Sequence, residues 1–208
     1  SDGFVQASNA QGLNGYVFSY PGCAFQLFDS PFAATNECAG WRADVLSALQ
    51  QLQPKVLMIA NLNSLYVEKS LPDWSIEDTQ LIWGSEITRM LKGLSVLHTQ
   101  VIIAQPPPRF AYDLRYDLSL LWPNSVTEPR GVVVSRRETI NAIEQNATTG
   151  FDFVQPIVNF TDQFCDTNIC DPKIGHEFML EDDDHLSVDG SRLVVPQLQA
   201  AIAGALGL

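Results

Sequence analysis

The sequence predicts an α/β domain in which a mostly parallel sheet carries helices on both faces. Strand-like and helix-like apolar periodicities alternate along its 208 residues, and that alternation is typical of parallel sheets with crossover helices. Two segments, Lys55–Ala60 and Gln100–Ala104, are continuous apolar runs of the kind that a parallel sheet buries on both faces. The length suits one domain, and we find no internal repeat or linker that would divide it.

The first half of the chain offers a local reason for each element. Ser1 or Asp2 can cap a helix over residues 2–11, and residues 15–20 are expected to form a strand that ends at a Pro-Gly turn. Apolar side chains recur at helical spacing over residues 41–52. The segment 75–78 resembles a capping box and predicts a long helix to about Leu97.

In the second half, three consecutive prolines stop the strand at 100–104, and residues 111–133 are irregular and aromatic. A helix is expected at about 135–147, a short strand at 151–154 and a strand-like segment at 177–180. A terminal helix is predicted over residues 187–206. Because Pro196 lies inside it, we expect a kink or a break there.

The composition excludes several classes of protein. An apolar fraction of 46% is enough for a buried core, so a disordered tail or a fibrous repeat is excluded. Lys and Arg total 12 and Asp and Glu total 24, which gives a net charge of −12. Such a charge argues against nucleic acid and anionic lipid as main partners. No apolar stretch approaches the ~20 residues of a membrane span, and no signal peptide is recognisable.

The four cysteines form two local pairs, Cys23 with Cys38 and Cys165 with Cys170, each around a polar loop. Two loop-closing disulfides are the simplest of the three possible connectivities, and they indicate an oxidising compartment. Four free thiols in a cytosolic protein are the alternative. The spacing within each pair does not fit a zinc site. We therefore expect a mature or excised piece of an exported protein.

His185 is the candidate catalytic residue. It lies in the sequence Asp-Asp-Asp-His-Leu-Ser over residues 182–187, just ahead of the last helix. The Asp182 carboxylate, three residues earlier, could hold the imidazole tautomer and stabilise the imidazolium that forms when His185 takes a proton. One alternative is an acidic turn in which Ser187 caps the helix. Another is a cation site made of Glu181, Asp182 and Asp184, although its spacing matches no calcium loop.

Gly22 and Asn61 are candidate oxyanion donors because each follows a predicted strand. A backbone N–H and a side-chain amide are the donors that stabilise a tetrahedral intermediate. Pro-Gly turns and strand-end asparagines are also common structural features, and Asn63 competes with Asn61 for the role.

Other residues have weaker functional interpretations. His98 is expected to be a surface or helix-capping residue, and Arg109 is either an anion-binding or a plain surface residue. Asn146 and Asn159 lie in glycosylation sequons, which also occur by chance. Four aromatic residues of the 110–133 segment could stack on sugars or pack internally: Phe110, Tyr112, Tyr116 and Trp122.

The ordered blocks Tyr20–Cys23, Ile59–Asn61 and Asp182–Ser187 resemble the SGNH hydrolase superfamily. The chain most resembles the SGNH domain fused to the membrane-spanning part of bacterial acyltransferase-3 proteins, in which a Gly-Cys and a second cysteine pair recur. The resemblance implies a flavodoxin-like, three-layer α/β/α sandwich and no cofactor or metal. It implies O-acyl transfer or ester hydrolysis, with His185 as general base, Asp182 as its orienting carboxylate, and Gly22 and Asn61 as oxyanion donors.

The family's Gly-Asp-Ser nucleophile block has no counterpart in the sequence. Residues 2–11 resemble the helix that follows this block, so we expect residues 1–208 to be a single SGNH-like domain that lacks its first strand and nucleophile. A domain that never had the serine, or Ser1 as a substitute, is the alternative. Without a serine, residues 1–208 alone are not expected to catalyse acyl transfer.

Three functions follow from the resemblance. The leading hypothesis is an extracytoplasmic, membrane-tethered domain that transfers an acyl group, expected to be acetyl, to a hydroxyl of a cell-envelope glycan or glycolipid. The acyl donor would come from a membrane-embedded acyltransferase domain of the same polypeptide. The alternatives are a secreted carbohydrate esterase and a non-catalytic carbohydrate-binding domain.

Overall fold

The structure is a computed structural model that describes residues 2–20, 23–25, 36–61, 75–111, 127–175, 177–181 and 185–208. The described chain is a mixed α/β structure with a small parallel sheet. It divides into two compact units, which are described separately. The first unit comprises Ser1–Tyr16, Gln105–Thr139 and Val158–Ala203, and the second comprises Val17–Ala104, Ile140–Ile157 and Gly204–Leu208.

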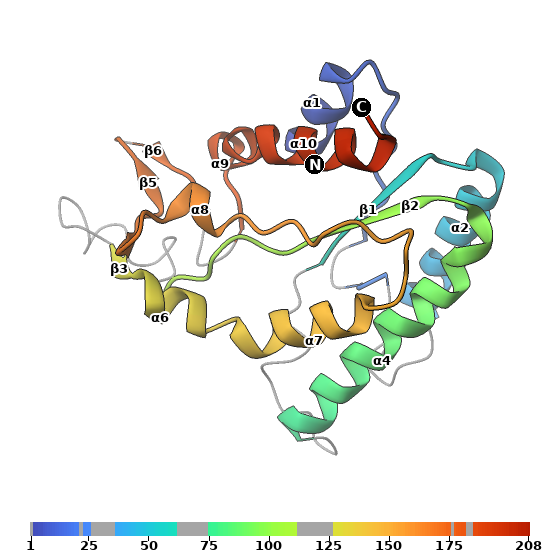
Figure 1. The fold of residues 1–208 in the computed structure, drawn as a ribbon, viewed down its shortest axis with the longest axis horizontal. Helices are drawn as coiled ribbons and strands as arrows, with labels where there is room; N and C mark the ends of the chain where they lie inside the picture. Colours follow the sequence, from blue (N-terminus) through green and yellow to red (C-terminus); the bar gives the residue numbers. More distant parts are fainter. Residues whose placement is uncertain are drawn as a thin grey trace. The chain divides into compact units, whose positions relative to one another are not determined.

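The second unit is built on the parallel strands β1 (Val56–Ala60) and β2 (Gln100–Ala104), which lie side by side (Figure 1). On the other side of β2, the Val101 N–H donates to the Phe153 carbonyl at 2.8 Å, and the Gln155 N–H donates to the Val101 carbonyl at 2.8 Å. A parallel bridge joins Val101 to Val154. β2 is therefore the middle of three parallel chain segments.

Three helices and a 3₁₀ turn accompany this sheet: α2 (Asn36–Leu52), α4 (Ile76–Leu94), η1 (Ser95–Leu97) and α7 (Glu138–Thr148). Their buried apolar side chains form one core with Val101 and Ile103 of β2. Trp83 of α4 is 1% exposed, and its indole N–H donates to the Glu144 carboxylate of α7 at 3.2 Å. α4 and α7 therefore pack against each other over the sheet, as Figure 1 also shows.

The capping box that begins α4 is confirmed. The Ser75 hydroxyl accepts from the Asp78 N–H at 3.1 Å, and the Asp78 carboxylate accepts from the Ser75 N–H at 3.0 Å. The prediction for the end of this helix is also close, because η1 continues α4 to Leu97. His98 follows in the left-handed conformation, with φ 53°, and is exposed, as expected for a capping residue.

The prediction of strands buried on both faces is confirmed for β2 and wrong for β1. In β2, Val101 and Ile103 face the core described above, and the alternate residues Ile102 and Ala104 are buried as well. In β1 only Ile59 is buried and Ala60 is exposed. The reason is position, since no described segment pairs with the outer edge of β1.

The first unit holds the remaining elements. They are α1 (Asp2–Ala10), β3 (Glu128–Pro129), α6 (Arg130–Ser135), α8 (Thr161–Phe164), β4 (Ile169–Cys170), β5 (Lys173–Ile174), β6 (Glu177–Phe178), α9 (Val188–Leu193) and α10 (Val195–Leu206). β3 pairs with β4 and β5 with β6, both antiparallel. α1 confirms the predicted first helix, and it packs closely on α9 because Gly3 lies against the Ser191 carbonyl.

Several predicted boundaries are wrong. Residues 15–20 form no strand, and the Tyr16 side chain is 64% exposed, because no described segment pairs with them. α2 begins at Asn36 rather than Trp41. The helix expected at about 135–147 is α7, which begins three residues later, at Glu138, and the separate helix α6 before it was not predicted. The strand expected at 151–154 is reduced to the bridge at Val154.

The break predicted for the terminal helix is confirmed. α9 and α10 are separated at Val194, two residues before Pro196. Proline has no N–H to donate to the carbonyl four residues earlier, and its ring clashes with that carbonyl. A continuous helix from Ser187 to Leu206 is therefore not possible without distortion.

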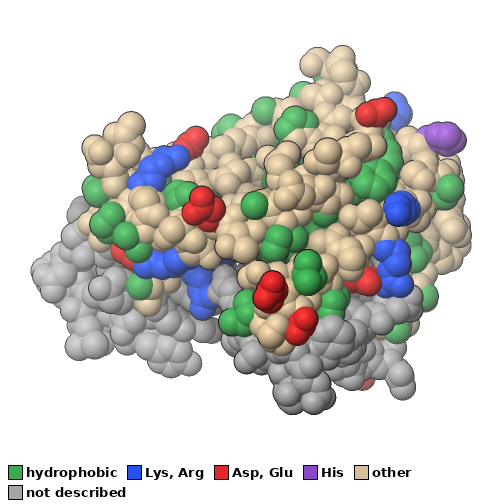
Figure 2. All heavy atoms as spheres, turned by 60° about the horizontal axis from the view of Figure 1, so that its bottom comes forward, with side chains coloured by type: hydrophobic (Ala, Val, Ile, Leu, Met, Phe, Trp, Pro, Cys, Tyr) green, Lys and Arg blue, Asp and Glu red, His purple; other side chains and the backbone are tan. Residues whose placement is uncertain are grey.

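On the face drawn in Figure 2, basic side chains lie among acidic ones. Ion pairs also join neighbours on one helix, such as Arg192 with Asp189 at 2.8 Å. None of the described helices is long and apolar enough to span a membrane.

Candidate active site

His185 lies in a loop whose two ends are held together by backbone contacts. The Glu181 N–H donates to the His185 carbonyl at 2.8 Å, and an antiparallel bridge joins Leu180 to Leu186. The His185 side chain is exposed. An accessible imidazole on a residue whose own backbone is held by a hydrogen bond is a suitable arrangement for a general base. Asp182 lies outside the described residues, as does Asp184, so of the alternative cation site only Glu181 is described.

Ser187 connects this loop to the helix that follows. Its N–H donates to the Met179 carbonyl at 3.0 Å and its hydroxyl donates to the Phe178 carbonyl at 2.8 Å. The same hydroxyl accepts from the Gly190 N–H at 3.0 Å, so Ser187 is the N-cap of α9. The capping interpretation of Ser187 is therefore confirmed. It is compatible with a catalytic His185, because the cap fixes the backbone two residues after the imidazole.

The hairpin β5–β6 and the second disulfide precede this loop in the same unit. The Met179 N–H donates to the Pro172 carbonyl at 2.7 Å, which ties the end of β6 to the start of β5. The predicted disulfide between Cys165 and Cys170 is present, with 3.8 Å between the Cα atoms. It closes a short loop just before the hairpin.

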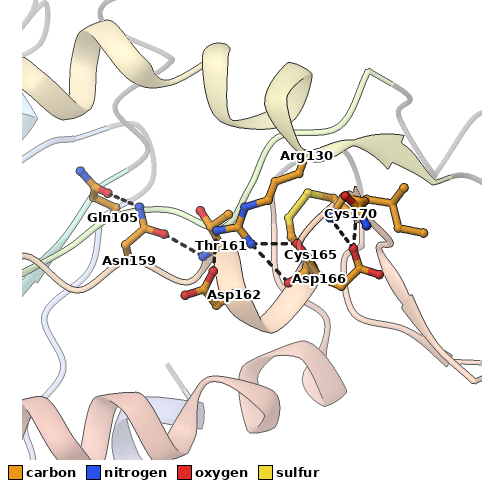
Figure 3. Close-up of polar contacts among 10 residues, drawn as sticks. Gln105, Arg130, Asn159, Thr161, Asp162, Cys165, Asp166 and Cys170 are labelled. Carbon is orange, nitrogen blue, oxygen red and sulfur yellow. Dashed lines mark hydrogen bonds and ion pairs between the residues drawn. A yellow bond between two sulfur atoms is a disulfide. The ribbon is translucent and has the colours of Figure 1, made fainter.

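Arg130 holds this disulfide loop from outside (Figure 3). One guanidinium nitrogen donates to the Asp166 carbonyl at 2.9 Å, and the other donates to the Asp162 carboxylate at 2.6 Å. Inside the loop, the backbone N–H groups of Ile169 and Asn168 donate to the Asp166 carboxylate and lower its pKa below the usual value.

Asn159, one of the two candidate glycosylation residues, has a structural role in the same region. Its amide nitrogen donates to the Gln105 side chain at 2.9 Å, and its amide oxygen accepts from the Thr161 N–H at 2.7 Å (Figure 3). The amide oxygen therefore helps to form the turn that begins α8, and the amide nitrogen joins this turn to Gln105.

In the second unit, Asn61 lies at the carboxyl end of β1 and contacts the segment that follows Gly22. Its amide oxygen accepts from the Phe25 N–H at 3.3 Å. The Ala24 carbonyl, in the same peptide group as that N–H, accepts from the Arg42 guanidinium at 3.3 Å. The predicted disulfide from Cys23 to Cys38 anchors the segment to α2. Gly22 and Asn63 lie outside the described residues.

Two of the other candidate residues, Phe110 and Arg109, lie in the described part of the chain. Phe110 is 2% exposed, so it packs internally and the sugar-stacking interpretation is wrong for this residue. Arg109 is half-buried, and its carbonyl accepts from Arg136 at 2.9 Å. Tyr112, Tyr116 and Trp122 lie outside the described residues.

Within the described ranges, no group of three His, Cys, Asp or Glu side chains could hold a metal ion.

The comparison with protein families decides the assignment. The family model described as "SGNH domain (fused to AT3 domains)" matches residues 1–200. The chain belongs to this family. The predicted family is thereby confirmed.

The SGNH domain also has a similar solved structure, the periplasmic domain of a lipopolysaccharide acetyltransferase from Salmonella ser. Paratyphi A. The TM-score is 0.65 and the sequence identity is 13%, over 100% of this chain and 78% of the other. At that identity the likeness shows a shared fold. A comparison with curated proteins gives no match.

Two residues of the SGNH domain that shape these loops were not identified from sequence. Arg42 falls between Trp41 and Val45 of the predicted apolar helix face, where no local signal distinguishes a buried arginine from an exposed one. Gly190 is buried at the start of α9. The sequence signal for Gly190 was a glycine in the first turn of a predicted helix. Glycine is unfavourable at that position unless the backbone approaches another group closely.

Proposed function

We propose that the SGNH domain carries out O-acyl transfer in a membrane-linked acyltransferase, moving an acyl group, acetyl in the simplest case, to a hydroxyl of a cell-envelope glycan or glycolipid. Membership in a family fused to AT3 domains is the observation that carries the proposal. The AT3 part of the same polypeptide would supply the acyl donor. The shared fold with a lipopolysaccharide acetyltransferase domain supports acetyl as the group and a saccharide as the acceptor.

The location follows from the same findings. Two disulfides require an oxidising compartment, and the similar solved structure is a periplasmic domain. We therefore place the domain outside the cytoplasm, tethered through the AT3 part. Within the same proposal the domain is a three-layer α/β/α sandwich of the flavodoxin-like type.

The proposed chemistry starts from an acyl ester on a serine of the full-length polypeptide. The acceptor hydroxyl attacks the ester carbonyl while His185 takes the hydroxyl proton. The carbonyl π electrons move to oxygen, and the Gly22 N–H and the Asn61 amide stabilise the resulting oxyanion. The intermediate then collapses, the new ester bond to the sugar remains, and the serine oxygen leaves with the proton returned by His185. Asp182 keeps the imidazole in the correct tautomer.

The exposed side chain of His185 and the hydrogen bond that holds its backbone support the role of general base. The geometry of Asn61 supports its role as well. Its amide oxygen accepts from the Phe25 N–H, so the NH2 end of the amide is the end that can donate to an oxyanion.

The test is His185→Ala in the full-length polypeptide, with His98→Asn as the matched control. Both changes remove an exposed histidine, and asparagine tolerates the left-handed conformation of residue 98. We expect His185→Ala to abolish acyl transfer to a sugar acceptor while the circular dichroism spectrum stays unchanged. His98→Asn should keep full activity. Unchanged transfer by His185→Ala would overturn the assignment.

Product analysis separates the proposal from its alternatives. Release of free acid with no acylated sugar, in the presence of excess acceptor, would indicate a carbohydrate esterase. Saccharide binding without any ester turnover would indicate a binding domain.

A further inference from the structure

Arg42 has no role in the chemistry above, yet it is among the most completely buried large side chains of the described chain. It lies in α2 and is 1% exposed. Burying a guanidinium removes it from water, which is costly unless good hydrogen bonds replace that hydration. Its neighbours on the same helix face, Val45 and Leu49, are apolar core residues. An arginine at this position therefore needs an explanation other than packing.

The Arg42 guanidinium contacts the peptide group that joins Ala24 to Phe25. Its Nη1 donates to the Ala24 carbonyl at 3.3 Å. The N–H of the same peptide group, on Phe25, donates to the amide oxygen of Asn61 at 3.3 Å. Arg42, one peptide group and Asn61 thus form a continuous hydrogen-bonded chain within one unit.

The order of these hydrogen bonds, from Arg42 through the peptide group to Asn61, affects the Asn61 amide. A positive charge at the carbonyl polarises the peptide group and makes its N–H a stronger donor. The stronger donor fixes the Asn61 amide oxygen and therefore the direction of the amide N–H bonds. The charge of Arg42 acts at the carbonyl end of this peptide group, and Asn61 accepts at its N–H end.

We infer that Arg42 is a positioning residue that acts through the Ala24–Phe25 peptide group to orient the Asn61 amide as an oxyanion donor. The inference rests on the proposed function of Asn61. A hydrogen bond that serves only the transition state changes kcat and leaves KM nearly constant. If Arg42 had only a structural role, its replacement would lower stability without a selective change in kcat.

The experiment is a double-mutant cycle on the full-length polypeptide, with hydrolysis of 4-nitrophenyl acetate as the assay. Asn61→Ala should lower kcat by about 10²–10³-fold, as for loss of one oxyanion donor. Arg42→Met should lower kcat by between about 10-fold and 100-fold with KM unchanged, the range for a misplaced catalytic group. In the Asn61→Ala background, Arg42→Met should change kcat by less than about 2-fold, because the two residues act as one unit.

Val45→Ala is the matched control. It removes buried volume from the same helix one turn after Arg42 and takes away no hydrogen-bonding group. It should lower the unfolding temperature and leave kcat unchanged. Arg42→Lys serves as a second variant that keeps the charge, and it should recover part of the lost kcat.

The outcomes distinguish the two proposals. Full kcat in Arg42→Met, an undiminished Arg42 effect in the Asn61→Ala background, or an equal loss of kcat in Val45→Ala would each overturn the role of Arg42. If instead Asn61→Ala keeps full kcat, the oxyanion role of Asn61 is wrong and the role of Arg42 fails with it. Loss of activity in His185→Ala would still support the proposed function in all of these cases.

Discussion

Gly190→Ala should destabilise the SGNH domain far more than a typical surface substitution. A methyl group at this position would overlap the Met179 carbonyl oxygen and lie 2.8 Å from the carbonyl carbon, a distance that real Cβ atoms essentially never show. The same carbonyl accepts the Ser187 N–H, and the Gly190 N–H donates to the Ser187 hydroxyl. The methyl group can be accommodated only if α9 moves away from residues 178–180.

The expected cost combines overpacking, about 1–3 kcal/mol, with a weakened helix cap, about 1 kcal/mol, and one weakened backbone hydrogen bond, about 1 kcal/mol. We expect a loss of roughly 3–5 kcal/mol in the free energy of unfolding. For a domain of this size that corresponds to a fall in Tm of roughly 10 °C. Urea denaturation followed by far-ultraviolet circular dichroism measures it. The His185 loop shares these contacts, so acyl transfer should fall with stability.

Gly204→Ala is the control for Gly190→Ala. Gly204 lies in α10, with open space where the added methyl group would lie. The same substitution there should be neutral or stabilising by up to about 1 kcal/mol, because alanine favours the helix. A Gly190→Ala protein within about 0.5 kcal/mol of the parent, the range of ordinary surface substitutions, would refute the close packing of α9 on Met179.

Three further predictions concern local stability. Asp166→Asn should destabilise the domain at pH 7, and the difference from the parent should shrink as the pH falls below about 4. The sign of this pH dependence follows from the lowered pKa of the Asp166 carboxyl in the folded state. The carboxylate stabilises the fold above the pKa of the unfolded state, and this contribution is lost when Asp166 is protonated. A stability difference that stays constant between pH 7 and pH 2.5 in urea denaturation would contradict the prediction. Ser75→Ala should cost about 1 kcal/mol by removing half of the capping box with Asp78, and an unchanged denaturation midpoint would show that the cap is unimportant. Replacing Cys165 and Cys170 together by serine should cost roughly 2 kcal/mol for so short a loop, and a protein as stable as the parent in urea denaturation would show that the loop does not need its crosslink.

The sequence was most informative where a local rule was sufficient. β2 is a continuous apolar run, and the structure buries it on both faces. The capping box at Ser75 and the helix break near Pro196 depend on a few neighbouring residues, and both are confirmed. The disulfide pairs were predicted because each pair encloses a short loop.

Predictions failed where the answer depended on what lies beside a segment. Residues 15–20 have the composition of a strand, but a strand needs a partner, and no described segment supplies one. β1 has the same apolar character as β2 but lies at the edge of the described sheet, so its side chains are less buried. Phe110 is aromatic in an irregular segment, and only packing shows that it is internal.

By itself, the sequence determined the family, the alternation of strands and helices, the disulfide pairs and the identity of His185, Asp182, Gly22 and Asn61 as candidates. These properties are carried by residue type and spacing, which a linear chain displays. The tertiary structure alone decided that Arg42 is buried beside Ala24, that Asn61 accepts from Phe25, and that Gly190 lies against Met179. Some of these contacts join residues that are distant in sequence, and others depend on how closely two backbone segments approach each other. No local pattern specifies either kind of contact.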